Sequence, residues 1–230
     1  MKINTITGTE NREIDDLLYG FDDRFQKLVE EIENNSTVNS KILDIGCGEG
    51  KIWQLFPGHN VTGLDISEKN LKKAKKYLKP VLGKAEELPF MSESFDLVIA
   101  SEILEHLFRP EQALQEINRV LRQKGKAIIT FPNTASLSFR ISLLIWGRNP
   151  TLNYPDNSEH IRFFDLESIK KLLYNNTKLT IKKIRGGGFL SFSKVNFGVY
   201  IPIPRIIRVV GGDLFPKLAR GYIIILEKNA

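Results

Sequence analysis

Three closely spaced glycines form the first group of residues whose pattern could do chemistry. Gly46, Gly48 and Gly50 lie in LDIGCGEGK, directly after a short apolar run. Glycine tolerates a positive φ and lets a small molecule approach backbone N–H groups. The spacing is G-x-G-x-G, one residue shorter than the G-x-G-x-x-G pattern that is typical of dinucleotide binding. By itself the stretch fits an ordinary turn, a phosphate cradle or a seat for another small molecule.

An acidic residue at the end of the next apolar run narrows these choices. Asp65 closes VTGLD, 15 residues after Gly50. A carboxylate at the end of the second strand of a β-α-β unit can accept hydrogen bonds from the 2′ and 3′ hydroxyls of a ribose. The alternative is that Asp65 only caps the helix that begins at Ser67. We favour the ribose role because the glycine loop and the acid fall in one β-α-β unit.

Histidine is the side chain best suited to proton transfer near neutral pH, and the chain has three. His59, in the turn PGHN, carries no functional prediction. His106, in EILEHL, either belongs to the site or packs locally at a helix end. His160, in SEHIRFF, is the candidate catalytic residue, as a general base or substrate contact; the alternative is that it orders its loop. The single cysteine and these histidines show no metal-ligand spacing, so no metal site is expected.

Alternating strands and helices are predicted to position these residues. Apolar runs predict strands at 41–45, 60–66, 81–85, 95–100 and 125–131, and the segments between them predict helices at 50–56, 68–79 and 110–122. This order implies right-handed crossovers and a parallel sheet with helices on both faces. Ligands of such sheets bind at the carboxyl ends of the strands, where the glycines and Asp65 fall.

The flanking segments complete the predicted fold. Apolar residues at three- and four-residue steps predict a helix at 12–34, and a long insertion follows at 132–160. A helix is expected at 165–175. The runs at 178–184 and 220–228 predict an antiparallel pair that closes the sheet edge, whereas 186–219 suggests no particular element.

Bulk composition excludes several classes of protein. The chain has 230 residues, of which 42% are hydrophobic, so it can fill a sizeable core. No apolar run reaches the ~20 residues that a membrane-spanning helix needs. The first residues contain no apolar stretch like that of a secretory signal, and a lone cysteine cannot form an internal disulfide. We therefore expect a cytoplasmic protein.

Positive charge is concentrated in the C-terminal part. Residues 182–230 carry a net charge of +7, whereas the chain as a whole carries +6. The same part contains the apolar stretch VYIPIPRIIRVV. Basic and apolar residues together suggest contact with a membrane surface, here the inner face, or with an anionic substrate. The alternative is a solvated basic strand face whose apolar face packs on the core. Without an aromatic reading platform, a nucleic acid partner is not expected.

Five motifs in this order make the chain resemble the class I S-adenosylmethionine-dependent methyltransferases, and most closely their small-molecule LDIGCGxG group. The motifs span about residues 40–131 and are ILDIGCGEG, GLDIS, AEELPF, FDLVIASEILEHL and AIITFPN. SEHIRFFDLESIKKLL, at 158–173, is similar to a segment of quinone, lipid and glycan-linked methyltransferases. The resemblance implies a doubly wound, mostly parallel seven-stranded Rossmann-like α/β sheet, with an antiparallel edge hairpin and an inserted cap after the fifth strand.

The resemblance also implies S-adenosylmethionine as cofactor and S-adenosylhomocysteine as product. The residues that it places at the cofactor are Asp44, Gly46, Cys47, Gly48, Asp65, Ile66, Ala85, Glu86 and Ser101. The first four would seat the methionine and ribose parts, with Asp44 orienting the loop or the amino group through water. Asp65 would hold the ribose hydroxyls. Ile66, Ala85 and Glu86 would surround the adenine, and Ser101 would line the methionine end.

Three residues outside this set carry further expectations. Many relatives have an acid where this chain has Lys84, which cannot accept a hydrogen bond from the adenine amino group. The adenine is then read by backbone atoms alone. Arg24 and Tyr19 lie on the N-terminal helix, which in such enzymes closes over the cofactor, and Arg24 could meet the methionine carboxylate.

We accordingly expect a single domain over residues 1–230. Its parts are a helical lid (1–38), a cofactor-binding core (39–131), an acceptor-site insertion (132–164) and a C-terminal helix with late strands (165–230). The predicted activity is methyl transfer to a small-molecule, lipid-linked or glycan-linked acceptor. The alternatives are a nicotinamide-dependent oxidoreductase, which the short glycine spacing disfavours, and a non-catalytic cofactor-binding protein of the same fold.

Overall fold

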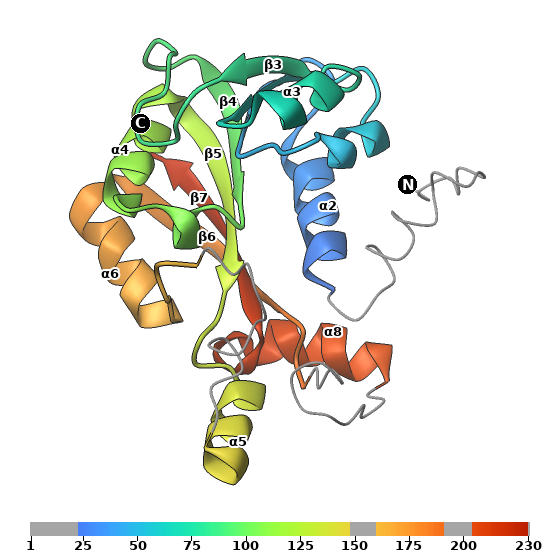
Figure 1. Cartoon of the computed structure of the whole chain (residues 1–230), viewed down its shortest axis with the longest axis vertical. Helices are drawn as coiled ribbons and strands as arrows, with labels where there is room; N and C mark the ends of the chain where they lie inside the picture. The colour runs from blue at the N-terminus through green and yellow to red at the C-terminus, as the bar shows by residue number, and fades with distance from the viewer. Residues whose placement is uncertain (1–22, 148–159, 191–203, 230) are drawn as a thin grey trace.

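A computed structural model gives the fold and describes residues 23–147, 160–190 and 204–229 (Figure 1). Its centre is a seven-stranded sheet with the order β3-β2-β1-β4-β5-β7-β6. The strands are β1 (Lys41–Ile45), β2 (Asn60–Asp65), β3 (Lys79–Leu82), β4 (Phe95–Ser101), β5 (Leu121–Pro132), β6 (Leu179–Gly187) and β7 (Gly221–Lys228). The first five strands pair in parallel, and β7 runs antiparallel between β5 and β6. The predicted fold class and its antiparallel edge are confirmed.

Helices cover both faces of this sheet. On one face, α4 (Pro110–Val120) and α6 (Leu166–Asn176) pack on the apolar side chains of β4, β5 and β7. On the other face lie α2 (Arg24–Asn35), the 3₁₀ turn η2 (Lys51–Leu55) and α3 (Glu68–Ala74). Because β1 and β4 are covered on both sides, their sequences are nearly continuous apolar runs. Burial of these two clusters stabilises the fold and fixes the carboxyl edge of the sheet.

Local sequence signals set most of the helix starts. Pro110 occupies the first turn of α4, where its missing N–H costs nothing. Asp165 and Ser168 form a reciprocal capping box at the start of α6. Ser136 accepts a hydrogen bond from the Phe139 N–H and begins α5 (Leu137–Trp146), which lies within the predicted insertion.

Several predicted boundaries were wrong. The strand expected at 81–85 is β3, Lys79–Leu82, because the following residues turn back and pair Lys84 with Glu87 in a single bridge. The helix after Ser67 ends at Ala74 instead of 79, and β5 begins at Leu121 instead of 125. The helix expected at 12–34 lies partly outside the described residues, and Tyr19 lies entirely outside them. Its described part is α2, Arg24–Asn35.

The stretch without a prediction, 186–219, contains a helix. Within it α8 (Arg205–Leu214) is followed by the 3₁₀ turn η5 (Pro216–Leu218). The apolar run RIIRVV therefore forms a helix and not the strand face considered above. It packs beside β6 and α2 at the end of the molecule where α5 also lies (Figure 1).

Candidate functional site

The glycine loop leaves β1 in a tight, left-handed course. Gly46, Gly48 and Gly50 have φ values of 70°, 54° and 70°, which are strained for any residue with a Cβ. The N–H groups of Gly46 and Cys47 both donate to the Leu64 carbonyl, at 2.7 and 3.1 Å. A Cβ on Gly46 would lie 2.4 Å from the Ile103 Cδ1 atom. The glycines are therefore required by a specific turn that packs against β2 and against the segment after β4.

Asp65 joins this loop to the start of α3. Its Oδ2 atom accepts the Gly48 N–H at 2.9 Å, and its Oδ1 atom accepts the Ser67 N–H at 2.8 Å. The helix cap itself is the Ser67 hydroxyl, which accepts the Asn70 N–H. Each carboxylate oxygen has further lone pairs that could receive a ribose hydroxyl. The structure thus brings Asp65 together with the glycines, as the ribose hypothesis requires.

Asp44 is a buried acid below the loop. Its side chain is 5% exposed, and its Oδ2 atom accepts a 2.7 Å hydrogen bond from the Trp53 indole N–H. Burial raises the pKa of Asp44 to about 7, the Trp53 hydrogen bond opposes the rise, and the negative charge of Asp65 adds to it. A cationic group placed over the loop would relieve this cost, which fits the role expected for Asp44 towards a ligand amino group.

Cys47 is a packing residue in this loop. A Cβ on Gly63 would lie 2.7 Å from the Cys47 Sγ atom, so the thiol occupies the space that the glycine leaves. Burial, and then the charges of Asp44 and Asp65, raise the pKa of Cys47 to about 12. The thiol stays protonated near neutral pH and is a poor nucleophile.

A pocket of about 350 Å³ opens beside the loop. It lies between α2 and the carboxyl ends of β1 and β4, and the residues that line it are Phe25, Leu28, Asp44, Gly46, Cys47, Glu49, Gly50, Lys51, Ile52, Ile99 and Ser101. Four of the residues predicted to bind the cofactor are in this list, namely Asp44, Gly46, Cys47 and Ser101. The pocket has the position expected for the methionine end of the cofactor.

The predicted adenine side lies at the ends of β2 and β3. Ile66 is 77% exposed directly after Asp65, so its apolar surface is available to a flat ring. The Gly83 N–H donates to the Asp65 carbonyl, which brings the turn containing Ala85 and Glu86 beside it. Ala85 is buried at 4% exposure, so its backbone is its main contribution to a ligand.

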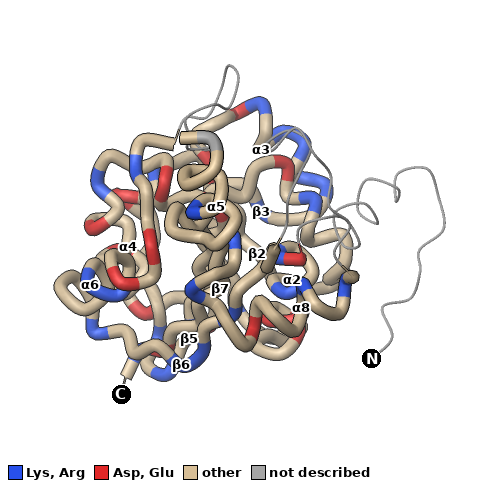
Figure 2. Tube along the Cα trace, turned by 90° about the horizontal axis from the view of Figure 1, so that it is seen from below, with Lys and Arg blue, Asp and Glu red and all other residues tan. Residues whose placement is uncertain are grey.

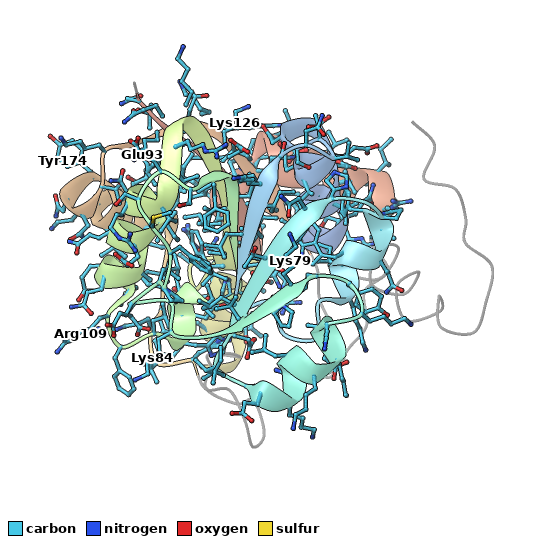
Figure 3. The ribbon with its side chains drawn as sticks, turned by 90° about the horizontal axis from the view of Figure 1, so that it is seen from above. Lys79, Lys84, Glu93, Arg109, Lys126 and Tyr174 are labelled. Atoms are coloured by element: carbon cyan, nitrogen blue, oxygen red, sulfur yellow. The ribbon has the colours of Figure 1, made fainter. Side chains whose placement is uncertain are left out.

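Lys84 and Glu86, which flank Ala85, line a second cavity. The Lys84 side chain is exposed, and the cavity, which Arg109 also lines, has a volume of about 570 Å³ between the turn and α4 (Figure 3). Glu86 lines this cavity and not the pocket beside the glycine loop. The expectation that backbone atoms read the adenine stays a prediction.

Ser101 begins a hydrogen-bonded chain at the end of β4. Its hydroxyl lies 2.9 Å from the Thr130 hydroxyl, which donates to the Glu102 Oε1 atom at 2.9 Å. Glu102 has a φ of 50° and also donates its N–H to the Thr130 hydroxyl oxygen. A non-glycine residue in this conformation is uncommon and is found most often where function demands it.

Arg24 reaches the same point from α2. Its Nη1 atom lies 2.9 Å from the Glu102 Oε2 atom. A Cβ on Gly187 or Gly221 would collide with the Arg24 side chain, so these glycines leave room for its path across β6 and β7. Arg24 was expected to meet the methionine carboxylate, and the structure places it against a carboxylate of the protein itself.

Glu105, His106 and His160 form a cluster beside Glu102. One potential ligand atom from each of the three lies within 4.8 Å of the others, and the two imidazole centroids are 4.7 Å apart. The Ile161 and Arg162 N–H groups donate to the Glu105 carbonyl at 2.9 and 3.0 Å. These bonds hold the end of the insertion, and His160 with it, against the short 3₁₀ turn η3 (Leu104–His106).

The Glu105 carboxyl group is unusual because it is fully buried and neither of its oxygens has a hydrogen-bond partner among the described residues. Burial, and then the Glu102 charge, raise the pKa of Glu105 to about 8. Burial and the neighbouring His106 lower the pKa of His160. A carboxyl group beside two imidazoles is a donor set that divalent metal ions accept once all three ligand atoms are deprotonated.

The structure therefore adds residues that the sequence did not indicate. The sequence alone predicted no role for Glu102, Glu105 or Thr130, although both acids belong to the motif SEILEHL. Metal binding was not expected because the ligands are separated in the chain by the whole insertion. Asn133, in contrast, is structural: it is fully buried and its amide donates to the Lys217 and Ala219 carbonyls.

Comparison with known proteins agrees with this geometry. Residues 43–129 match the family model described as a methyltransferase domain. The chain is 30% identical over 166 residues to the human mitochondrial ubiquinone biosynthesis O-methyltransferase, covering 66% of this chain and 45% of that protein. It is 34% identical over 137 residues to a demethylmenaquinone methyltransferase of Thermotoga maritima, covering 54% and 58%.

Two further matches extend over more of the relatives' length. An uncharacterized protein of Methanocaldococcus jannaschii is 32% identical over 172 residues, which cover 66% of this chain and 68% of that protein. The crystal structure of a possible histamine N-methyltransferase from Thermotoga maritima has a TM-score of 0.66 and 20% identity, over 96% of each chain. The chain spans about half the length of the first curated relatives that it matches.

A doubly wound sheet with a glycine loop and an acid at the end of β2 defines a nucleoside-binding α/β protein. The family model and the two methyltransferase relatives then assign the chain to the class I S-adenosylmethionine-dependent methyltransferases, and the solved structure has the same fold. The cofactor of this family fits the residues present, since the loop is bare, the pocket adjoins it and Asp65 has lone pairs free for a ribose. Among the described residues, no helix has the length and apolarity to cross a membrane.

Proposed function

We propose that the protein transfers the methyl group of S-adenosylmethionine to a hydroxyl group of a small, lipid-linked or glycan-linked acceptor. The observation that supports this most directly is the Glu105, His106 and His160 cluster, which adjoins Ser101 and Glu102 at the end of the cofactor pocket. Neutral hydroxyl groups are weak nucleophiles. A cluster of acid and imidazole groups can accept the hydroxyl proton or lower the pKa of the hydroxyl group.

The cofactor, when bound, supplies an electrophilic methyl group on its sulfonium. The chain then has to hold the cofactor, align the acceptor oxygen and accept its proton. Asp44 and Asp65, beside the glycine loop, hold and orient the ligand. Because η3 follows the end of β4 after a few residues, the acid and imidazole groups lie close to Ser101, and we propose that the acceptor enters there.

We further propose that the cluster holds a divalent cation. Glu105 offers a buried carboxylate whose charge nothing in the described chain offsets by a hydrogen bond, and the two imidazoles complete three ligands. A cation there lowers the pKa of an oxygen that binds next to it. His160, the predicted base, would then serve as a ligand that positions the acceptor.

The names of the matched relatives suggest the class of acceptor. Two of them are called ubiquinone biosynthesis O-methyltransferase and demethylmenaquinone methyltransferase. We therefore propose a ring that carries a hydroxyl group and an apolar substituent. Reaching such a lipid-linked molecule would require peripheral contact with a membrane.

Incubation of cell extract with trideuteromethyl-labelled cofactor tests the proposal. Mass spectrometry should reveal a product whose mass is shifted by the labelled methyl group, and its fragmentation should place the group on oxygen. Calorimetry should show S-adenosylhomocysteine binding and no competition from NADH. Firm cofactor binding without any labelled product would support the non-catalytic alternative, and NADH binding would support the oxidoreductase.

Glu105→Gln tests the cation separately. Thermal unfolding with Mn²⁺ or Mg²⁺ should show a metal-dependent rise in the wild type that is absent in this variant. Glu93→Gln is the control, since Glu93 is an exposed acid elsewhere in the molecule (Figure 3). Equal responses of the wild type and Glu105→Gln would refute the cation site and leave the methyl transfer itself untouched.

A further inference from the structure

Helix α5 buries two polar side chains and exposes several apolar ones, which is unusual for a helix in contact with water. Its serines Ser138 and Ser142 are buried, at 1% and 2% exposure. Three consecutive apolar side chains near its C-terminal end face outward: the exposed fractions are 58% for Leu143, 87% for Leu144 and 62% for Ile145. Single exposed apolar residues are common, but a run of three on one helix turn marks an interaction surface.

Helix α8 presents a second apolar face. The exposed side chains along it and just after it are Ile206 at 72%, Ile207 at 47%, Val210 at 47%, Leu214 at 67% and Phe215 at 55%. The helix turns its two small residues, Gly211 and Gly212, to the protein and exposes this apolar face. This pattern is typical of helices that lie in the plane of a membrane surface.

The orientation of α8 is fixed by buried charges. The Lys27 ammonium group, whose side chain is 1% exposed, donates to the Val209 carbonyl at 2.9 Å and to Asp213 at 3.1 Å. Arg185 pairs with the same aspartate. A Cβ on Gly212 would collide with the Gly186 carbonyl oxygen, so the helix lies directly on β6. The protein therefore holds the apolar face outward by specific contacts.

Both helices lie at the end of the molecule that carries the proposed acceptor site. In Figure 1, α5 and α8 project from the same end, and Figure 2 views the molecule from that end. α5 follows β5 after a few residues, and the carboxyl ends of β4 and β5 carry Ser101, Glu102 and Thr130. A surface that docked α5 and α8 would thus lie close to the entrance for an acceptor.

Basic side chains accompany this apolar surface. Arg140 on α5, Arg205 on α8 and Lys217 on η5 are exposed, and Lys217 also forms an ion pair with Glu167 at 3.0 Å. Apolar side chains flanked by arginine and lysine complement a bilayer that contains anionic lipids. A second copy of the chain fits less well, because a symmetric contact would bring the same basic groups together.

We propose that α5 and α8 form a docking surface for an anionic lipid bilayer. Leu144 and Ile206 insert among the acyl chains, while the basic residues contact the headgroups. The surface rests on the proposed function in one respect, since it would bring the enzyme to a lipid-linked acceptor. Docking and cofactor binding nevertheless involve different residues and can be measured separately.

Vesicle sedimentation of the full chain tests the proposal. The wild type should pellet with vesicles of phosphatidylglycerol and phosphatidylcholine, and at least tenfold less with phosphatidylcholine alone. Leu144→Glu and Ile206→Glu should each weaken binding at least tenfold, because each places a carboxylate within the apolar face. About 0.5 M salt should weaken binding of the wild type, since it shortens the screening length to a few ångström.

Tyr174→Glu is the matched control. Tyr174 is 87% exposed on α6, away from both helices (Figures 1 and 3), so the change introduces the same charge at an equally exposed apolar site. It should pellet like the wild type, and all variants should bind S-adenosylhomocysteine alike, which shows that they are folded.

Three outcomes would overturn the docking surface. One is a wild type that does not pellet with anionic vesicles although it binds S-adenosylhomocysteine, a result that leaves the proposed methyl transfer standing. The second is a loss of pelleting in Tyr174→Glu equal to that in Leu144→Glu. The third is sedimentation velocity showing a dimer that Leu144→Glu and Ile206→Glu dissociate, which would assign the surface to a second copy. Pelleting without any cofactor binding would instead contradict the proposed function and leave the docking surface intact.

Discussion

Replacement of Asp65 by asparagine should weaken cofactor binding strongly while leaving the fold in place. In the free protein each carboxylate oxygen accepts one backbone N–H, from Gly48 and from Ser67, at 2.9 and 2.8 Å. Asparagine is nearly isosteric, but it keeps only one acceptor oxygen. Its amide group must face either a backbone N–H or a ribose hydroxyl.

The expected loss follows from the hydrogen bonds involved. A hydrogen bond to a charged group contributes about 1.5–3 kcal/mol, and the substitution removes the charge from both ribose contacts and one acceptor outright. We expect binding of S-adenosylhomocysteine to weaken by about 3 kcal/mol, which is about a hundredfold in Kd. Isothermal titration calorimetry measures this directly.

Asp96→Asn is the matched control for this prediction. Asp96 also accepts a backbone N–H, from Lys41 at 2.8 Å, and also carries a second contact, with Arg122. It lies at the amino ends of β1 and β4, the edge of the sheet opposite the glycine loop. Its replacement should leave the Kd unchanged. Binding by Asp65→Asn within threefold of the wild type, or an equal loss in both variants, would refute the ribose role.

Three other perturbations follow from the geometry. Gly46→Ala should lower the melting temperature more than Gly48→Ala. Both glycines have a positive φ, but only a Cβ at position 46 would meet another side chain, that of Ile103. Equal shifts in differential scanning calorimetry would contradict this prediction. Asp44 has a folded pKa of about 7 against an ordinary 3.8, so the folded state binds the extra proton and its stability falls as pH rises between these values. Urea unfolding of Asp44→Asn from about pH 4 to 8 should show a flatter profile than the wild type, and an unchanged slope would argue against the shift. Lys27→Met leaves Asp23 and two carbonyls of its buried site without their donor and should cost about 3–5 kcal/mol of unfolding free energy, whereas a loss under about 1 kcal/mol would show that the site relaxes.

The sequence predicted the features whose partners are near one another along the chain. The glycines and Asp65 belong to one β-α-β unit, so their meeting needs only the handedness and short connections of that unit. The parallel strands were predictable because strands covered on both faces become apolar runs. The errors at β3 and α3 arose where the polar stretch KKAKKYLKP gave no periodicity to place a boundary.

The remaining features depend on contacts that sequence spacing does not encode. His160 meets Glu105 and His106 because two backbone hydrogen bonds hold its segment against η3. α8 was missed because Gly211 and Gly212 break helix propensity, yet their lack of a side chain is what allows the helix to lie on Gly186 and Phe189. In both cases a tertiary contact overrides the local signal.

Arg24 links the two halves of the proposed site. Its guanidinium forms an ion pair with Glu102. The negative charge of Glu102 raises the pKa of the buried Glu105. If a ligand carboxylate draws Arg24 away, Glu102 and Glu105 lose a compensating positive charge within the same cluster. The cluster then gains affinity for a proton or a divalent cation, by the amount that Arg24 had contributed. In the proposed function, this exchange would couple cofactor binding to acceptor activation through Arg24, and Gly187 and Gly221 provide the space that its side chain needs.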